Sequence, residues 1–496
     1  MGLDRDLWRL ASVVVLGTIM SILDTTIVNV AIQTLGRELH ASLTSIQWVS
    51  TGYLLALATV IPLTGWSMER FGGRNMWMIS VALFLAGSAL CGLAWSTESL
   101  IAFRVLQGFG GGMIMPVGMA LLAQTAGPHR VGRVMSVIGV PMLLGPILGP
   151  VIGGLIVDSW SWRWIFYVNV PIAIVSLALA EKLLHPAAGR ADAGKLDWLG
   201  LLLLSPGLAG VVFGLSETET HGGMGDPIAW GPIVAGLILI AAFVMHAARA
   251  PRPLIDVRLF KVPAFGSAAA TTFLLAGSLF GAMLILPLYY QVDRGESALA
   301  AGLLMAPQGL GAAAVMPIAG KLADKVGGGR VAVVGLIIAT IGTLPFAFVG
   351  GDTPYALLAG VLVIRGIGIG STMMPAMAAA YATLDSAAVP RATSALNVLQ
   401  RVGGALGTCI LAVVLQHEIR ETLGGAAAGG GIGINVPPGA QARVADTLAG
   451  AFATTFWWAV GACLLALIPA IILARTERRA PRAHPVPAET VERQAA

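Results

Sequence analysis

Four charged side chains lie well inside the long apolar runs of this 496-residue sequence. Asp24 is the acidic residue among them, and the basic residues are Arg104, Arg365 and Arg401. If the runs cross a bilayer, each buried charge costs about 2.5–3.5 kcal/mol on insertion scales, so it is retained mostly for function or for pairing. A carboxyl group in apolar surroundings can bind and release a proton near neutral pH. We therefore interpret Asp24 as a candidate proton carrier, with a purely structural role between helices as the alternative.

The depths of Asp24 and Arg104 in their runs predict that the two side chains meet. Counted from the same side, they lie about seven and five residues from the run ends, which places them within roughly 3 Å in depth. A guanidinium beside a carboxylate stabilises the charged form, and separating the two favours the protonated form. This pattern predicts a proton switch, and a fixed structural ion pair is the alternative.

The other two buried arginines have less specific surroundings. Arg365 precedes alternating glycines and loosely repeats Arg104 and its glycines, so it is a candidate counterpart in the second half of the chain or a pocket residue. Arg401 lies a turn or two inside its run, which favours snorkelling of the side chain to the aqueous surface over a substrate role. The sequence leaves open whether these two arginines are functional or structural.

Fourteen long apolar runs must position these charges. Hydrophobic residues make up 56% of the chain and charged residues 11%, and the mean hydropathy is +0.83, whereas soluble proteins carry about a quarter charged residues. Each run approaches the roughly 20 residues with which a helix spans a bilayer, and the strands of membrane barrels are only about ten residues long. We predict an all-α polytopic membrane protein and exclude a soluble enzyme. The expected spans are 9–31, 46–66, 75–95, 99–124, 134–157, 164–184, 196–216, 228–248, 263–291, 299–320, 331–349, 354–380, 394–416 and 451–474.

Lysine and arginine residues gather in alternate loops between these runs, and this bias sets the orientation of a membrane protein. With the N-terminus inside, an even number of spans places the C-terminus inside as well. The net charge of +5 is spread over these short loops and does not indicate nucleic-acid binding. We expect a multi-pass protein of the inner (plasma) cell membrane with both termini cytoplasmic. The basic residues then left outside are Arg37, Arg163, Arg294, Arg420 and Arg443.

Two inside loops share a pattern that indicates related halves. Residues 65–74 and 320–330 both fit Gly-x-x-x-[Asp/Glu]-[Arg/Lys]-x-Gly-Gly and begin 255 residues apart, and internal repeats are common in transporters. The glycines allow close helix contacts and a tight turn, and the acids can accept from donors or a helix N-terminus across the gap. We predict a gate, with a solvated basic turn that only sets topology as the alternative. The gate residues are Gly65, Glu69, Arg70, Gly72, Arg74, Gly320, Asp324, Lys325 and Arg330.

These loops and three further motifs resemble the major facilitator superfamily. Residues 65–74 are similar to its loop signature, 104–112 to its fourth-helix motif, and 23–31 to the first-helix motif of its fourteen-span drug:proton antiporter branch. Glu69 replaces the usual aspartate, and Gly73 stands where a basic residue is common, which weakens the expected clasp. The fifth run resembles the motif linked to antiport through Gly145, Pro146, Gly149, Pro150, Gly153 and Gly154.

The resemblance covers nearly the whole chain and implies the major facilitator fold. That fold has two six-helix bundles, and this branch adds two central helices, giving fourteen transmembrane helices. Here the N-terminal bundle would occupy residues 1–190, the linker pair 191–255 and the C-terminal bundle 256–475, and a disordered cytoplasmic tail would occupy 476–496.

The resemblance and the scarce membrane-embedded charges favour a proton-coupled multidrug efflux transporter for hydrophobic or cationic small molecules, working by alternating-access antiport. The sequence has no Walker A, HExxH or GxSxG motif, so we expect no enzyme activity, no metal and no cofactor, and a proton gradient as the driving force. Its partners would be the substrates, protons and the lipid bilayer, not nucleic acid. Export of a specific endogenous lipid or metabolite shares every motif and stays open, whereas an intramembrane enzyme or receptor is disfavoured. Candidate pocket residues are Tyr53, Met115, Phe280, Met305 and Arg365.

Overall fold

The computed structural model describes residues 5–127, 129–184, 194–220, 227–423 and 441–477. Within these ranges the regular elements are all helical, and thirteen helical segments are long and apolar enough to cross a membrane. Helix α6 (Val131–Ser159) adds a fourteenth segment of 29 residues. The predicted all-α polytopic fold is confirmed, and each predicted span corresponds to one of these segments.

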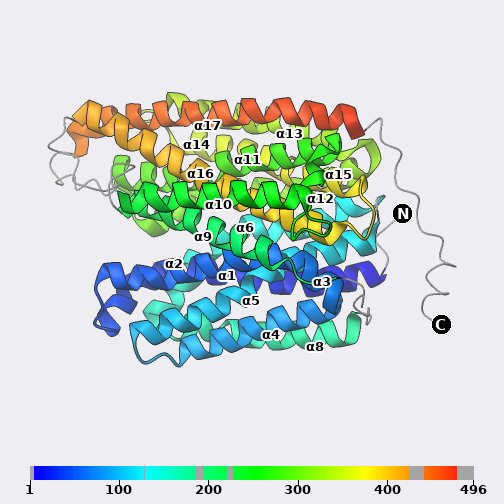
Figure 1. The fold of residues 1–496 in the computed structure, drawn as a ribbon. Coiled ribbons are helices and arrows are strands. Elements are labelled where there is room, and N and C mark those ends of the chain that lie inside the picture. The colour runs from blue at the N-terminus through cyan, green and yellow to red at the C-terminus, as the bar shows by residue number, and fades with distance from the viewer. Residues whose placement is uncertain (1–4, 128, 185–193, 221–226, 424–440, 478–496) are drawn as a thin grey trace.

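The helices fall into two groups, and a pair of helices lies between these groups in the sequence (Figure 1). The first group contains α1 (Arg5–Glu38), α2 (Leu43–Val60), α3 (Thr64–Phe71), α4 (Gly73–Gly92), α5 (Thr97–Ala126), α6, α7 (Trp164–Tyr167) and α8 (Asn169–Leu183). The pair is α9 (Trp198–Thr220) and α10 (Pro227–Arg249). The second group contains α11 (Pro263–Leu288), α12 (Ala298–Val326), α13 (Gly328–Thr343), α14 (Tyr355–Gly370), α15 (Met373–Ala382), α16 (Val389–Leu423) and α17 (Gln441–Glu477).

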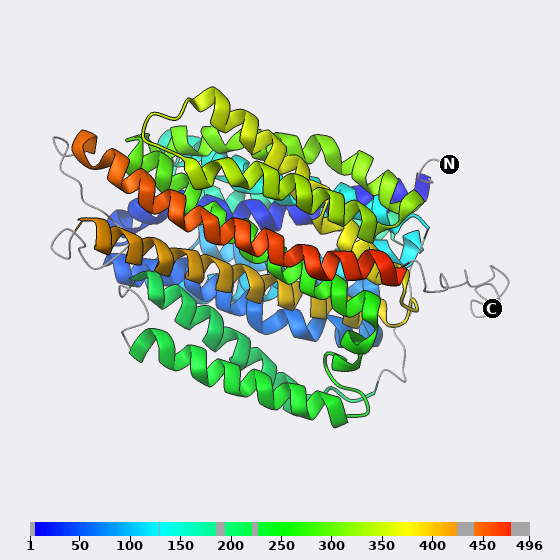
Figure 2. The same cartoon turned by 90° about the horizontal axis from the view of Figure 1, so that it is seen from above.

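Both termini of the described chain lie at one end of the helix bundle (Figure 1). We call this end, where α1 begins and α17 ends, the proximal end, and the opposite one the distal end. The first group occupies the lower part of the view and most of the second group the upper part, and α6 contacts α12 between them. The pair α9–α10 lies at one edge of the bundle beside α16, as Figure 2 shows, and α9 packs against both α2 and α16.

Glycine contacts repeat between the two groups and reveal the internal repeat in three dimensions. A side chain at Gly87 of α4 would place its Cβ 2.5 Å from the Cα atom of Gln107, and one at Gly342 of α13 would lie 2.6 Å from the Cα atom of Arg365. These glycines are 255 residues apart, the same spacing as the two loop motifs. Close packing of α4 on α5 therefore recurs as packing of α13 on α14.

The apolar core is shared at the proximal end and divided at the distal end. One cluster of buried side chains includes residues of both groups, among them Met119 of α5 and Met374 of α15. Toward the distal end, one cluster around Ile27 and Phe166 belongs to the first group, and another around Tyr289 and Phe452 belongs to the second. The two groups are therefore sealed against each other at the proximal end.

The expected domain boundaries fall largely between helices. The boundary at residue 190 lies in 185–193, outside the described residues, and the one at 255 lies between α10 and α11. Helix α17 continues to Glu477, so the helical part extends slightly past the expected end of the C-terminal bundle at 475. Of the expected tail, residues 478–496 lie outside the described part of the chain.

Candidate functional site

Asp24 and Arg104 form an ion pair in the interior of the first group. The Nη1 atom of Arg104 lies 2.6 Å from Oδ2 of Asp24, and the two side chains are 1% and 0% exposed. Asp24 lies near the middle of α1, and Arg104 lies two turns into α5 from the distal end. The structure thus brings together the two residues whose depths in the sequence agreed.

Two amides complete the surroundings of the Asp24 carboxylate. Gln107, one turn after Arg104 on α5, donates from Nε2 to Oδ1 of Asp24 at 2.8 Å, and Asn169 at the start of α8 donates from Nδ2 to the same oxygen at 2.9 Å. Asn169 also donates to the hydroxyl of Ser88 on α4 at 3.1 Å. The charged carboxylate is therefore held by donors from two further positions, which offsets the cost of burying the ion pair.

The guanidinium of Arg104 is enclosed by α2 and by its own helix. Its Nε atom donates to the carbonyl of Val49 at 3.2 Å, and its Nη1 atom also donates to Oε1 of Gln107 at 2.7 Å. The guanidinium carbon lies 3.9 Å from the centre of the Tyr53 ring, a cation–π arrangement that stabilises a desolvated arginine. These hydrogen bonds and the ring contact hold the guanidinium of Arg104 beside the charged carboxylate of Asp24.

Three glycines of the antiport-type motif fit α6 against the part of α1 that carries Asp24. A side chain at Gly145, Gly149 or Gly153 would meet Ile22, Thr26 or Ile27 of α1, respectively.

The hydroxyl of Thr26 also donates to the carbonyl of Gly145 at 3.4 Å. A side chain at Gly154 would enter open space, and nothing is described of the side chains of Pro146 and Pro150. The motif therefore connects the Asp24 segment to α6, which packs against α12 of the other group.

The first loop motif clasps the second group at the proximal end. Glu69 of α3 accepts from Nε and Nη2 of Arg391 on α16 at 2.7 and 2.8 Å, a two-pronged charge-assisted contact. Gly65 packs against the backbone of Arg391 with no room for a side chain, and its N–H donates to Oγ of Ser394 at 3.0 Å. We call this contact between Glu69 and Arg391 the first clasp.

The second loop motif clasps the first group in an equivalent way. Asp324 of α12 accepts from the backbone N–H of Gly132, at the start of α6, at 2.9 Å, and the Nε atom of Arg133 lies 3.6 Å away. Gly320 packs on the backbone of Gly132 and Arg133. An acid at a helix N-terminus is favoured by the helix dipole. We call the contact of Asp324 with Gly132 and Arg133 the second clasp.

The cations that close both clasps come from outside the two motifs. Within the motifs, Arg74 donates to the carbonyl of Glu181 on α8 at 3.1 Å, and Arg70 and Lys325 are exposed.

Arg330 follows the second glycine turn at the start of α13. Gly72 and Gly327 have φ angles of 82° and 100°, the left-handed backbone that the tight turns require. Gly73, where a basic residue was expected, is buried, and a side chain there would collide with Leu121.

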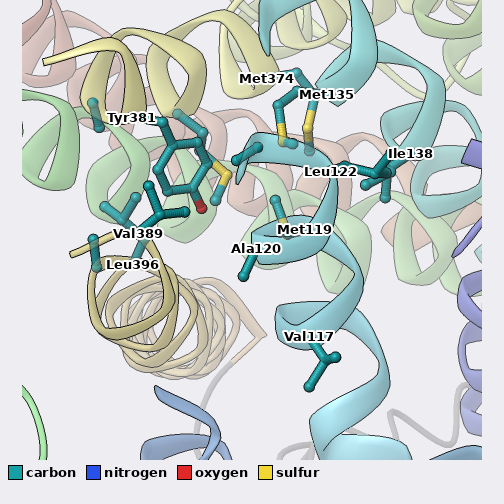
Figure 3. Close-up of a cluster of buried hydrophobic side chains, with 14 of the residues drawn as sticks. Val117, Met119, Ala120, Leu122, Met135, Ile138, Met374, Tyr381, Val389 and Leu396 are labelled. Carbon is teal, nitrogen blue, oxygen red and sulfur yellow. The ribbon is translucent and has the colours of Figure 1, made fainter. Parts of the chain in front are cut away.

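An apolar layer of buried side chains lies between the two groups (Figure 3). Met119 and Met135 of the first group face Met374, Val389 and Leu396 of the second group in this view. The methionines repack easily around neighbouring groups. Together with the two clasps, this layer closes the proximal end.

The structure revises several of the expected pocket residues. Tyr53 is 1% exposed and covers Arg104, and Arg365 is 2% exposed within the second group, so neither side chain is accessible to a ligand. Met115 and Met305 are half-buried, and Phe280 is 36% exposed with its ring against Gly404. The sequence did not distinguish these cases because large side chains fill cores as well as pockets.

Arg401 lies twelve residues into α16, about 18 Å from the proximal end of that helix. Its side chain is exposed, and its charge interacts with Tyr53 of the first group. Snorkelling of this side chain to the aqueous surface stays a prediction.

Gln107 and Asn169 were the functional candidates that the sequence reasoning missed. Gln107 occurs inside the fourth-helix motif at 104–112, but an amide inside an apolar run gives no charge signal of its own. Their proximity to Asp24 depends on α5 and α8 meeting α1, which no local pattern reports.

A family profile and the sequences of known proteins both relate this chain to one family of transporters. The Major Facilitator Superfamily profile matches residues 14–408. A Multidrug resistance protein B homolog of Mycobacterium tuberculosis is 41% identical over 97% of this chain and 93% of its own length. Lincomycin resistance protein LmrB of Bacillus subtilis is 28% identical over 80% of this chain and 84% of its own length.

Among solved structures, the human organic anion transporter MFSD10 superposes with a TM-score of 0.63 over 94% of this chain and all of its own, at 16% identity. That likeness shows the fold alone. The profile match and the 41% identical relative in M. tuberculosis establish that this chain belongs to the major facilitator superfamily.

Proposed function

We propose that the protein exports hydrophobic or cationic small molecules across the plasma membrane in exchange for protons. Relatives named for multidrug and lincomycin resistance support drug export, and the superfamily supports a transporter. The single observation that carries proton coupling is the buried ion pair of Asp24 and Arg104, because ionisable residues inside a membrane mark proton and ion pathways.

In this proposal the proximal end faces the cytoplasm. Lysine and arginine are concentrated in the loops at that end, as the positive-inside bias requires. The shared core and the two clasps then close the cytoplasmic side, so the structure corresponds to a state that exchanges substrate and protons with the outside.

Proton binding would break the pair that holds this state. A proton from outside adds to a carboxylate oxygen of Asp24, and the neutral acid loses its charge attraction to Arg104. Gln107 and Asn169 then also donate to a weaker acceptor. Because Gly145 and Gly149 fit α6 against this part of α1, a shift of α1 is transmitted to α6 and to α12. Opening toward the cytoplasm releases the proton, and the ion pair forms again.

Transport by purified protein in liposomes tests this mechanism. Vesicles containing ethidium, a hydrophobic cation, receive an imposed pH gradient, and dye movement and substrate-induced proton release are recorded together. We expect Asp24→Asn to abolish both signals while ethidium–ethidium exchange persists, because exchange needs no net proton transfer. The matched control is Glu98→Gln, an exposed carboxylate on α5, which should behave as wild type. Gradient-driven transport by Asp24→Asn at the wild-type rate would refute proton coupling at this residue.

A further inference from the structure

The linker pair α9–α10 is tied to the first clasp by a continuous set of hydrogen bonds. Arg391 uses two of its nitrogens for Glu69, and its Nη1 atom donates to the carbonyl of Pro253 at 3.1 Å. Pro253 belongs to the segment between α10 and α11, so the guanidinium joins three parts of the chain. The orientation of Arg391 toward Glu69 therefore depends on where the Pro253 carbonyl lies.

Asp197 fixes the position of that carbonyl. The N–H of Leu254, the residue after Pro253, donates to Oδ2 of Asp197 at 3.1 Å. The other oxygen of Asp197 accepts from the N–H of Gly200, in the first turn of α9, at 2.9 Å, and lies 2.8 Å from Nε2 of His246 near the end of α10. Asp197 is 10% exposed. One carboxylate thus joins the start of α9, the end of α10 and the segment that carries Pro253.

A second contact ties the same region to the helix that bears Glu69. The indole N–H of Trp66 on α3 donates to the carbonyl of Gly194 at 3.3 Å. Gly194 has a φ angle of +78°, and a side chain there would meet Arg252. We call residues 194–200 and 250–255 the linker junction. It touches both partners of the first clasp, Glu69 through α3 and Arg391 directly.

The described contacts of Asp324 in the second clasp lie away from the linker junction. The described partners of Asp324 come from the start of α6, and the pair α9–α10 packs instead on α2 and α16, at the side of the first clasp. The junction therefore acts on one clasp of the two.

We propose that Asp197 is a positioning residue for the first clasp, and that through it the α9–α10 pair sets how readily the proximal end opens. With Asp197 in place, the Pro253 carbonyl holds the guanidinium of Arg391 in the orientation that Glu69 needs. Without it, the 250–255 segment loses an anchor, and closing the clasp requires ordering both Arg391 and this segment. The inference rests on the proposed alternation between states, but not on proton coupling or on any particular substrate.

Distance distributions between spin labels measure this equilibrium without transport. Labels on Thr125→Cys and Asp385→Cys report the separation of the two groups, since both residues are exposed at the proximal end and the natural cysteines Cys91, Cys409 and Cys463 are buried. We expect Asp197→Ala to raise the ratio of open to closed protein about two- to tenfold, the range that corresponds to one hydrogen bond. Asp197→Asn keeps one acceptor oxygen, so it should give a smaller increase in this ratio. It replaces Asp197→Ala as the test variant if the alanine variant folds poorly.

A double-mutant comparison separates positioning from general destabilisation. If Asp197 acts through Arg391, then Asp197→Ala should add little in a Glu69→Gln background, where the clasp is already weakened. The control Asp256→Ala removes a neighbouring carboxylate that accepts from the N–H of Arg258, outside the linker junction and the first clasp, and it should match wild type.

An unchanged distribution in Asp197→Ala, or an equal increase in both backgrounds, would overturn the proposal. Failure of the proposed export would appear differently, because the distance shift would persist in a protein that shows no proton-driven dye movement.

Discussion

The two halves of the molecule build the same buried polar cluster from corresponding helices, but the acid is present in one of them. In the first half the cluster contains Asp24, Tyr53, Ser88, Arg104, Gln107 and Asn169, from α1, α2, α4, α5 and α8. In the second half it contains Ser278, Gln308, Thr343, Arg365 and Cys463, from α11, α12, α13, α14 and α17. The repeat thus conserves the location of the cluster and not its charge.

The surroundings of the two buried arginines differ accordingly. Arg104 faces a carboxylate at 2.6 Å, whereas Arg365 donates to Oε1 of Gln308, to Oγ1 of Thr343 at 3.2 Å and to the carbonyl of Ser278 at 3.4 Å. Leu279 stands 255 residues after Asp24, where the repeat would place an acid. A carboxylate beside an arginine has two charge states to exchange, and neutral acceptors have one. In the proposed mechanism the first half therefore responds to protons, and the second half serves as its fixed counterpart.

Replacing each of the two arginines in turn should reveal the largest difference between the halves, both in stability and in gradient-driven transport. Arg104→Gln leaves the buried Asp24 carboxylate without its counter-charge, at a cost of about 3–5 kcal/mol. Arg365→Gln replaces three donor nitrogens by one, so it leaves some of the neutral acceptors without a donor, at a cost of about 1–3 kcal/mol. Thermal unfolding in detergent should show the difference in stability, and pH-gradient-driven dye transport should be lost only in Arg104→Gln. Equal loss of gradient-driven transport in both variants would contradict the assignment of proton coupling to the first half.

Substitutions in the two clasps should differ less in their effect on the open fraction at the proximal end. Glu69→Gln removes the charge and one of the two hydrogen bonds at 2.7 and 2.8 Å to Arg391. Asp324→Asn keeps an oxygen for the N–H of Gly132 and loses only its charge attraction to an arginine 3.6 Å away. We expect the open fraction at the proximal end to rise about tenfold in Glu69→Gln and about threefold in Asp324→Asn, since charge-assisted bonds are the stronger ones. Spin-label distances across the proximal end measure both, and a larger effect from Asp324→Asn would reverse our ranking.

Packing at the helix crossings should distinguish the halves least. Gly149 fits α6 against Thr26 of α1, and Gly407 fits α16 against Gly277 of α11, with no room for a side chain in either place. We expect Gly149→Ala and Gly407→Ala each to lower stability by about 1–3 kcal/mol, because a forced methyl group must displace its neighbours. Unfolding temperatures give the measurement. The matched controls Gly154→Ala and Gly461→Ala have nothing within 4 Å of the new methyl group and should be as stable as wild type.

Much of this architecture could be predicted from the sequence because the signals are local. Apolar runs of the length of a bilayer gave the spans, and the agreement of Asp24 and Arg104 in depth anticipated a contact that the structure has at 2.6 Å. The paired loop motifs likewise predicted close glycine contacts and acids that accept across a gap. A run length, a depth and a turn each depend on a few consecutive residues, so no knowledge of neighbouring helices is needed.

Only the tertiary structure shows which distant residues contact the ones that these local features single out. Arg391 meets Glu69 across 322 positions of sequence, and Asn169 meets Asp24 across 145. Such partners depend on which helices pack together and on their rotation about their axes, and an apolar run is compatible with many rotations.

The sequence by itself therefore determined that this protein crosses the membrane many times, that its halves are related and that Asp24 is its exceptional charge. The structure alone placed Gln107 and Asn169 beside that charge, buried Tyr53 and Arg365, and joined the linker junction to the first clasp. The reason is physical: composition and periodicity fix what one segment can do, whereas close packing of distant segments fixes what it touches.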